Sequence, residues 1–113
     1  MLLTVDVGNT NIVFGGFRGE ELCFVSRMAT AKKITEDEYA VKIKDILSIH
    51  NVSESEVCGA IISSVVPSLT PILKKAIKTV YNVEAFLVGP GMRTGINLLV
   101  DNPAQVGSDL ICA

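Results

Sequence analysis

Apolar and polar residues follow two different periods along this chain, and the change of period predicts its elements. Residues 2–5, 12–17 and 21–28 are short apolar stretches separated by Gly, Asn and charged residues. Such stretches are typical of strands joined by tight turns. Because the connections are short, these strands must pair antiparallel. The beginning of the chain therefore predicts an antiparallel meander.

The period then changes to that of a helix. Thr35 and Glu38 have the spacing of a capping box, and apolar residues follow at helical spacing to about residue 49. A second helical pattern runs from Leu69 to Val80, with Ser68 as its expected N-cap after Pro67. Residues 58–66 and 84–88 are apolar and predict further strands, the first of them covered on both faces.

The predicted order of elements is β-β-β-α-β-α-β. Strand-helix-strand crossovers are right-handed and make their two strands parallel. We therefore expect an α/β fold, in which a mixed five-stranded sheet has helices packed on it.

Composition narrows the class of function. The 113 residues suffice for one domain, and 10 basic against 12 acidic residues give a net charge of −2, which does not favour a nucleic-acid partner. No apolar run approaches the ~20 residues of a membrane span, and a charged leader is absent, so we expect a cytoplasmic protein with no membrane partner. Cys23, Cys58 and Cys112 lie among aliphatic residues, and we interpret each as a small buried hydrophobe and not as a metal ligand.

The first candidate for chemistry is the turn after the first strand, Asp6 to Asn11. An unpaired carboxylate is costly away from water, so Asp6 at the end of a buried strand needs an explanation. One explanation is turn chemistry, because Gly8 and Asn9 tolerate positive φ and Asp accepts bonds from nearby backbone N–H groups. The other is a phosphate loop, which Asp6 would face through Mg²⁺ or its bound water, since like charges repel.

The end of the chain carries a second candidate. Asn102 before Pro103 suggests a helix start, and Gly107 then costs about 1 kcal/mol relative to Ala in a helix. A glycine is tolerated there if a ligand or another backbone comes close, and Asp109 lies two residues on. Residues 110–113 begin an apolar pattern that does not finish. We therefore expect the N-terminal part of a longer protein, truncated at the start of a helix.

Four spaced motifs resemble type III pantothenate kinase, a bacterial family of the acetate kinase, sugar kinase and actin superfamily. They are DVGNT at 6–10, SSVVP at 63–67, GMRTGIN at 91–97 and DNPAQVGSDL at 101–110. The resemblance implies that residues 1–113 form a ribonuclease H-like domain, one half of an actin-like ATPase. In the complete protein a second such domain, absent from this chain, would enclose ATP. This chain alone would then be inactive.

The resemblance also implies an activity and its site residues. The reaction is ATP-dependent phosphorylation of pantothenate to 4′-phosphopantothenate, the first step of coenzyme A biosynthesis, in a cytoplasmic homodimer. Asp109 matches the general base, and Asp6 matches the aspartate that acts through Mg²⁺. A monovalent cation, K⁺ or NH₄⁺, would bind in the missing half. The implied ATP-binding residues are Asp6, Val7, Gly8, Asn9, Thr10, Asn11, Ile12 and Val13, and the implied pantothenate-binding residues are Gly107, Ser108, Asp109 and Leu110.

Departures from the family pattern, among them Val100 where an aromatic residue is common, keep other hypotheses open. Ser108 replaces an alanine, and Leu110 replaces an arginine that would suit the carboxylate of pantothenate. A non-catalytic nucleotide-binding or regulatory relative could have lost substrate recognition in this way. Another small-molecule kinase of the same superfamily would also keep the phosphate loop.

Overall fold

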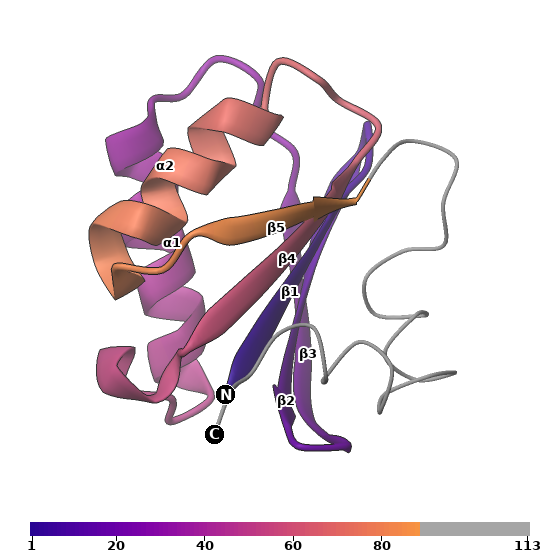
Figure 1. Cartoon of the computed structure of the whole chain (residues 1–113). Helices are drawn as coiled ribbons and strands as arrows, with labels where there is room; N and C mark the ends of the chain where they lie inside the picture. Colours follow the sequence, from indigo (N-terminus) through magenta and orange to yellow (C-terminus); the bar gives the residue numbers. More distant parts are fainter. Residues whose placement is uncertain (89–113) are drawn as a thin grey trace.

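The computed structural model describes residues 1–88, which form a five-stranded sheet with two helices on one side (Figure 1). The strands are β1 (Leu2–Val7), β2 (Asn11–Arg18), β3 (Glu21–Ala29), β4 (Gly59–Ser64) and β5 (Ala85–Val88). The helices are α1 (Glu36–Ile49) and α2 (Thr70–Tyr81), and a 3₁₀ turn, η1 (Glu54–Glu56), precedes β4. The predicted order of strands and helices is confirmed.

The central strand of the sheet is β1. The strand order is β3-β2-β1-β4-β5, with antiparallel pairing on the β2 and β3 side and parallel pairing on the β4 and β5 side. The mixed sheet expected from the sequence is therefore confirmed. Because both parallel crossovers are right-handed and run in the same direction across the sheet, α1 and α2 cover the same face. The carboxyl ends of β1, β4 and β5 meet at one edge.

The core lies between this face and the two helices. Alternate residues of the strands point into it, and each helix contributes one buried stripe, as the helical spacing predicts. Lys74, Lys75 and Lys78 lie on the outer side of α2, where they are partly or fully exposed. The largest fully buried core side chains include Leu3, Ile12, Phe14, Tyr39, Ile43, Leu47, Leu73 and Ile77. Neither helix of residues 1–88 is long and apolar enough to cross a membrane.

Close packing explains a glycine inside β2. A Cβ at Gly16 would lie 2.3 Å from a ring carbon of Phe24 and 2.8 Å from Sδ of Met1, so no larger residue fits. The Phe24 ring also stacks on His50, with the centroids 4.7 Å apart. His50 is exposed at the end of α1, and the sequence did not indicate this aromatic contact.

Two local predictions were wrong. Ser68 does not cap α2, because the helix begins at Thr70 after Leu69, with no side-chain cap. Pro71 sits in the first turn instead, where its missing N–H has no partner to lose. Cys23 and Cys58 are exposed and not buried, because Cys23 lies on the edge strand β3 and Cys58 precedes β4. Cys112 lies outside the described residues.

The capping box at the start of α1 is confirmed and allows a stability test. The Glu38 N–H donates to the Thr35 hydroxyl at 3.2 Å, and the Thr35 N–H donates to the Glu38 carboxylate at 3.3 Å. We expect Thr35→Ala to lower the free energy of unfolding by about 1 kcal/mol in urea denaturation. Thr79→Ala is the control, because Thr79 is exposed on α2 and its hydroxyl makes no hydrogen bond in residues 1–88. Equal losses in the two variants would contradict the capping role.

Candidate functional site

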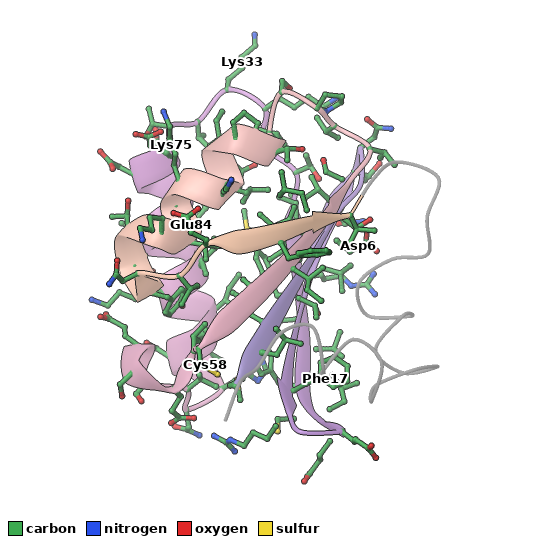
Figure 2. All side chains as sticks on the ribbon, in the orientation of Figure 1. Asp6, Phe17, Lys33, Cys58, Lys75 and Glu84 are labelled. Carbon is green, nitrogen blue, oxygen red and sulfur yellow. The ribbon has the colours of Figure 1, made fainter. Side chains whose placement is uncertain are left out.

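Asp6 lies near the end of the central strand, at the edge where the parallel strands finish (Figure 2). Its neighbours Val5 and Val7 point into the core, so its own side chain lies on the face opposite the helices. The carboxylate is half-buried, and no group in residues 1–88 donates a hydrogen bond to it. Burial raises the pKa of Asp6 above its ordinary value, because the ionised form loses hydration.

The turn-chemistry explanation of Asp6 is wrong. Neither Gly8 nor Asn9 has a positive φ, and the Asp6 carboxylate accepts no bond from the backbone of the turn. A partly desolvated carboxylate without a donor is unfavourable unless a cation or another donor binds to it. The partner of this carboxylate is therefore not found in residues 1–88, and the phosphate loop stays a prediction.

The loop that follows Asp6 is tight, and it leaves some donors unused. The Gly8 N–H donates to the Asn11 carbonyl at 2.9 Å, and a Cβ on Gly8 would lie 3.1 Å from that oxygen. A larger residue at position 8 would therefore make a tight contact with this carbonyl, and the Gly8 N–H is not available to a phosphate. Asn9, Thr10 and Asn11 are exposed, and their side chains donate to no group in residues 1–88. The N–H groups of Asn9 and Thr10 also have no partner there.

Residues distant in the sequence hold this loop in place. Thr30, directly after β3, donates its hydroxyl to the Gly8 carbonyl at 2.8 Å and its N–H to the Thr10 carbonyl at 2.9 Å. The next residue is fixed as well, because the Tyr39 hydroxyl donates to the Ala31 carbonyl and accepts from the Ala31 N–H. These bonds connect the loop to β3 and α1, so its free donors are held in a defined arrangement before any ligand binds.

A second polar residue, Ser63, lies beside Asp6. It is the cross-strand partner of Asp6 in the parallel β1–β4 pair, so both side chains are on the same face. Ser63 is only 7 % exposed, and its hydroxyl makes no hydrogen bond with the rest of residues 1–88. The next serine differs, because the Ser64 hydroxyl bonds both the N–H and the carbonyl of Val66, each at 3.0 Å. Sequence reasoning assigned no role to Thr30 or to Ser63, although Ser63 begins the SSVVP motif, since only the register and the tertiary contacts place these two hydroxyls near the loop.

The other predicted site residues are placed as follows. Val7 and Ile12 are 1 % and 0 % exposed, so only their backbone could approach a nucleotide. Val13 is partly exposed and is the antiparallel partner of Asp6. Gly107, Ser108, Asp109 and Leu110 lie outside the described residues, so the structure brings Asp6 together with the loop 9–11 only.

The single carboxylate of Asp6 suits a cation that takes most of its ligands from water or substrate. No group of three or more His, Cys, Asp or Glu side chains that could hold a metal ion occurs in residues 1–88. Mg²⁺ is usually held in proteins by one or two carboxylates, with waters and substrate phosphates completing its shell. Asp6 could supply one such carboxylate, and the exposed donors of residues 9–11 could bind phosphate oxygens.

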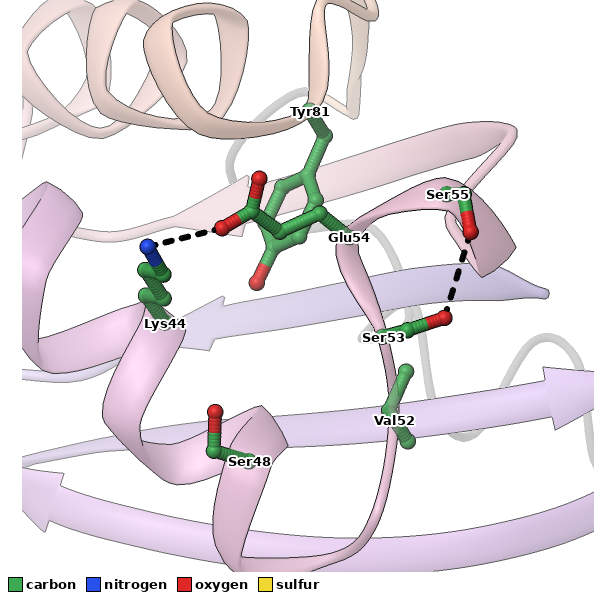
Figure 3. A pocket seen from close by; sticks show the side chains of 7 residues that line it. All are labelled: Lys44, Ser48, Val52, Ser53, Glu54, Ser55 and Tyr81. Carbon is green, nitrogen blue, oxygen red and sulfur yellow. Dashed lines mark hydrogen bonds and ion pairs between the residues drawn. The ribbon is translucent and has the colours of Figure 1, made fainter.

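Two cavities lined by described residues lie at the opposite end of the sheet. One, of about 440 Å³, lies between α1, η1 and α2, and the ion pair Lys44–Glu54 crosses it at 2.9 Å (Figure 3). The Tyr81 hydroxyl is buried there without a partner in residues 1–88, and burial raises the pKa of Tyr81. Met1 and Arg18 are among the residues that line the other cavity. Neither of them borders Asp6.

Solved structures with this architecture define the fold class. A ROK hexokinase from Thermus thermophilus matches with a TM-score of 0.58 and 16% identity over 78% of this chain and 34% of that chain. A Bacteroides thetaiotaomicron protein with an actin-like ATPase fold matches with a TM-score of 0.59 and 8% identity over 88% and 37%. RuvC from T. thermophilus, in complex with a Holliday junction, matches with a TM-score of 0.50 and 11% identity over 79% and 64%. This chain has the fold of one half of an actin-like ATPase, and it spans about a third of the first two proteins.

The family is shown by the sequence itself, because identities this low show only a fold. The family model of type III pantothenate kinase matches residues 2–113. The chain therefore belongs to the type III pantothenate kinase family, and the resemblance found in its motifs is confirmed.

The raised pKa of Asp6 leads to a prediction about stability. The folded state holds this proton more tightly than the unfolded state, so the free energy of unfolding should fall as pH rises from about 3.9 through the folded-state pKa. The Asp6→Asn variant has no carboxylate to ionise and so avoids this fall in the free energy of unfolding. We expect the variant to be more stable than the unsubstituted protein at pH 7 in metal-free buffer. Denaturation at several pH values measures the difference.

Asp45→Asn is the matched control, because Asp45 is exposed on α1. Comparison of the two variants separates the effect of removing the Asp6 carboxylate from the effect of removing one exposed negative charge. A decrease in stability for Asp6→Asn at pH 7 would mean that the carboxylate already has a stabilising partner.

Proposed function

We propose that the full-length protein transfers the γ-phosphoryl group of ATP to pantothenate and forms 4′-phosphopantothenate. The observation that carries this proposal is the half-buried Asp6 carboxylate, which has no donor in residues 1–88 and is followed by the free donors of Asn9 and Thr10. Family membership supplies the substrate class. Pantothenate and ATP are the small-molecule partners, and the proposal includes a cytoplasmic homodimer with no nucleic-acid or membrane partner.

Asp6 and the loop 9–11 would bind the nucleotide. Mg²⁺, when bound, would neutralise charge on the phosphates, and Asp6 would hold it directly or through its water. The N–H groups of Asn9 and Thr10 and the side-chain amides of Asn9 and Asn11 would donate to phosphate oxygens. Phosphoryl transfer depends mainly on positioning and on charge neutralisation, and this loop is already fixed by its bonds to Thr30.

Asp109 would activate the acceptor. The hydroxyl oxygen of pantothenate bonds to the γ-phosphorus, the bond from this phosphorus to the β–γ bridging oxygen breaks, and ADP leaves. The hydroxyl proton passes to the Asp109 carboxylate. Gly107, Ser108 and Leu110 would line the pantothenate pocket, and K⁺ or NH₄⁺ would bind in the other half of the protein. Leu110 cannot pair with the substrate carboxylate as an arginine would, so pantothenate should bind less tightly than in relatives that keep the arginine.

Incubation of the full-length protein with pantothenate, ATP and Mg²⁺ tests the proposal. Mass spectrometry should detect phosphopantothenate, and omission of Mg²⁺ should abolish it. Nucleotide binding without any phosphorylated product would favour a non-catalytic relative. ADP release stimulated by a different hydroxyl compound would favour another small-molecule kinase. The presence of Leu110 in place of the family arginine leaves this alternative open.

Substitution of the two aspartates should have different effects. Asp109→Asn removes the general base, so we expect kcat to fall by about 10² to 10⁴ while the Kd of Mg·ATP stays within about twofold. Asp6→Asn should instead raise the Mg²⁺ concentration needed for half-maximal rate. Steady-state kinetics and calorimetry measure both effects. Full turnover in Asp109→Asn would refute the base assignment, and an unchanged Mg²⁺ requirement in Asp6→Asn would refute the metal assignment.

A further inference from the structure

The face of the sheet opposite the helices carries its charges in one row. Arg27 on β3, Val13 on β2, Asp6 on β1 and Ser63 on β4 are successive cross-strand partners. Their side chains therefore lie on the same face, side by side across four strands. The neighbouring row on this face, through Thr4, contains no charged residue; its other members are Gly15, Val25, Ile61 and Phe86. Arg27 and Asp6 are thus opposite charges at matched positions.

These two charges do not neutralise one another. Arg27 is exposed and forms no ion pair in residues 1–88, and Asp6 also has no partner there. Adjacent strands lie about 4.8 Å apart, so the two Cα atoms are separated by about 10 Å, with Val13 between them. Elsewhere in the described residues a strand arginine does find a partner, because Arg18 at the far end of β2 pairs with Glu56. The space above Val13 therefore lies between an anion and a cation that have no partner in residues 1–88.

A metal-bound phosphate has the charge pattern that this row requires. Its cation would be held on the Asp6 side, while its phosphoryl oxygens carry negative charge toward the Arg27 side. The guanidinium group suits this role, because its planar N–H donors can bind two oxygens of one phosphate. The free donors of the loop that begins beyond Asp6 adjoin the same edge of the sheet.

We infer that Arg27 binds phosphoryl oxygens of the metal-bound nucleotide whose cation Asp6 holds. The inference rests on the proposed function for the identity of the ligand as a nucleoside triphosphate. By this inference β3 forms one wall of the phosphate site. No residue of this edge strand was predicted from the sequence to belong to the site. Ser63 lies on the other side of Asp6 in the same row, where its free hydroxyl can donate to the carboxylate and orient it.

Calorimetric binding of a non-hydrolysable Mg·ATP analogue to the full-length protein, without pantothenate, tests this inference. Arg27→Gln should weaken binding about tenfold or more, because a charge-assisted bond to phosphate is lost. Arg27→Lys should retain part of the affinity, since it keeps the charge and loses the paired donors. Arg18→Gln is the matched control and should leave the affinity unchanged. The effect of Arg27→Gln should diminish as salt increases.

An unchanged nucleotide affinity in Arg27→Gln, with the fold intact by circular dichroism, would overturn the inference. A rise in the KM of pantothenate with no change in nucleotide affinity would also overturn it, because Arg27 would then bind the substrate carboxylate. Failure of the proposed function is a separate result. A protein that forms no phosphopantothenate but loses nucleotide affinity in Arg27→Gln would contradict the pantothenate kinase proposal and support the phosphate contact.

Discussion

The carboxylate of Asp6 is the group on which the account of this site depends. It lies on the central strand, where burial removes part of its hydration, and no donor in residues 1–88 compensates for this loss. The fold tolerates that cost because the opposite face of the same strand packs Leu3, Val5 and Val7 into the core. The strand is therefore anchored by one face, while its other face carries a carboxylate with no partner in residues 1–88. Local destabilisation of this kind is common where a protein has to bind a ligand.

Contacts between distant parts of the chain fix the position of the loop next to the Asp6 carboxylate. The loop beyond Asp6 is short, but Thr30 holds it through two hydrogen bonds from the end of β3, and Tyr39 holds the segment that follows Thr30. Ser64 closes the turn after β4 on the other side. The N–H groups of Asn9 and Thr10 have no partner in residues 1–88, because the groups that fix the loop bind its carbonyls and not those donors. A loop held in this way loses little conformational entropy when a phosphate binds.

The sequence predicted most of the fold, because each element shows its own local signal. Short apolar stretches separated by turn residues predicted the strands of the meander, and the shortness of the turns predicted their antiparallel pairing. The Thr35–Glu38 spacing predicted the start of α1. The cap of α2 was mispredicted because Ser68 and Pro71 offer two competing start signals three residues apart. Cys23 was mispredicted because an apolar neighbourhood in sequence does not reveal that β3 is an edge strand.

The site was less accessible to such reasoning. Asp6 stood out because a carboxylate interrupts an apolar strand. Ser63, Thr30 and Arg27 gave no comparable signal, since their importance arises from strand register and from a contact across 22 positions. The fold alone did not decide the function either, because a sugar kinase and RuvC, solved in complex with a Holliday junction, both match it. The family model that matches residues 2–113 supplies the substrate class on which the proposed function rests.

A crystal structure of the full-length protein with Mg²⁺, a non-hydrolysable ATP analogue and pantothenate would test the account most directly. We expect the metal, or a water bound to it, on the Asp6 carboxylate, the phosphates against residues 9–11, and the Asp109 carboxylate facing the same cavity. A nucleotide bound elsewhere would contradict the account, as would carboxyl groups of Asp6 and Asp109 on opposite sides of the domain with packed protein between them.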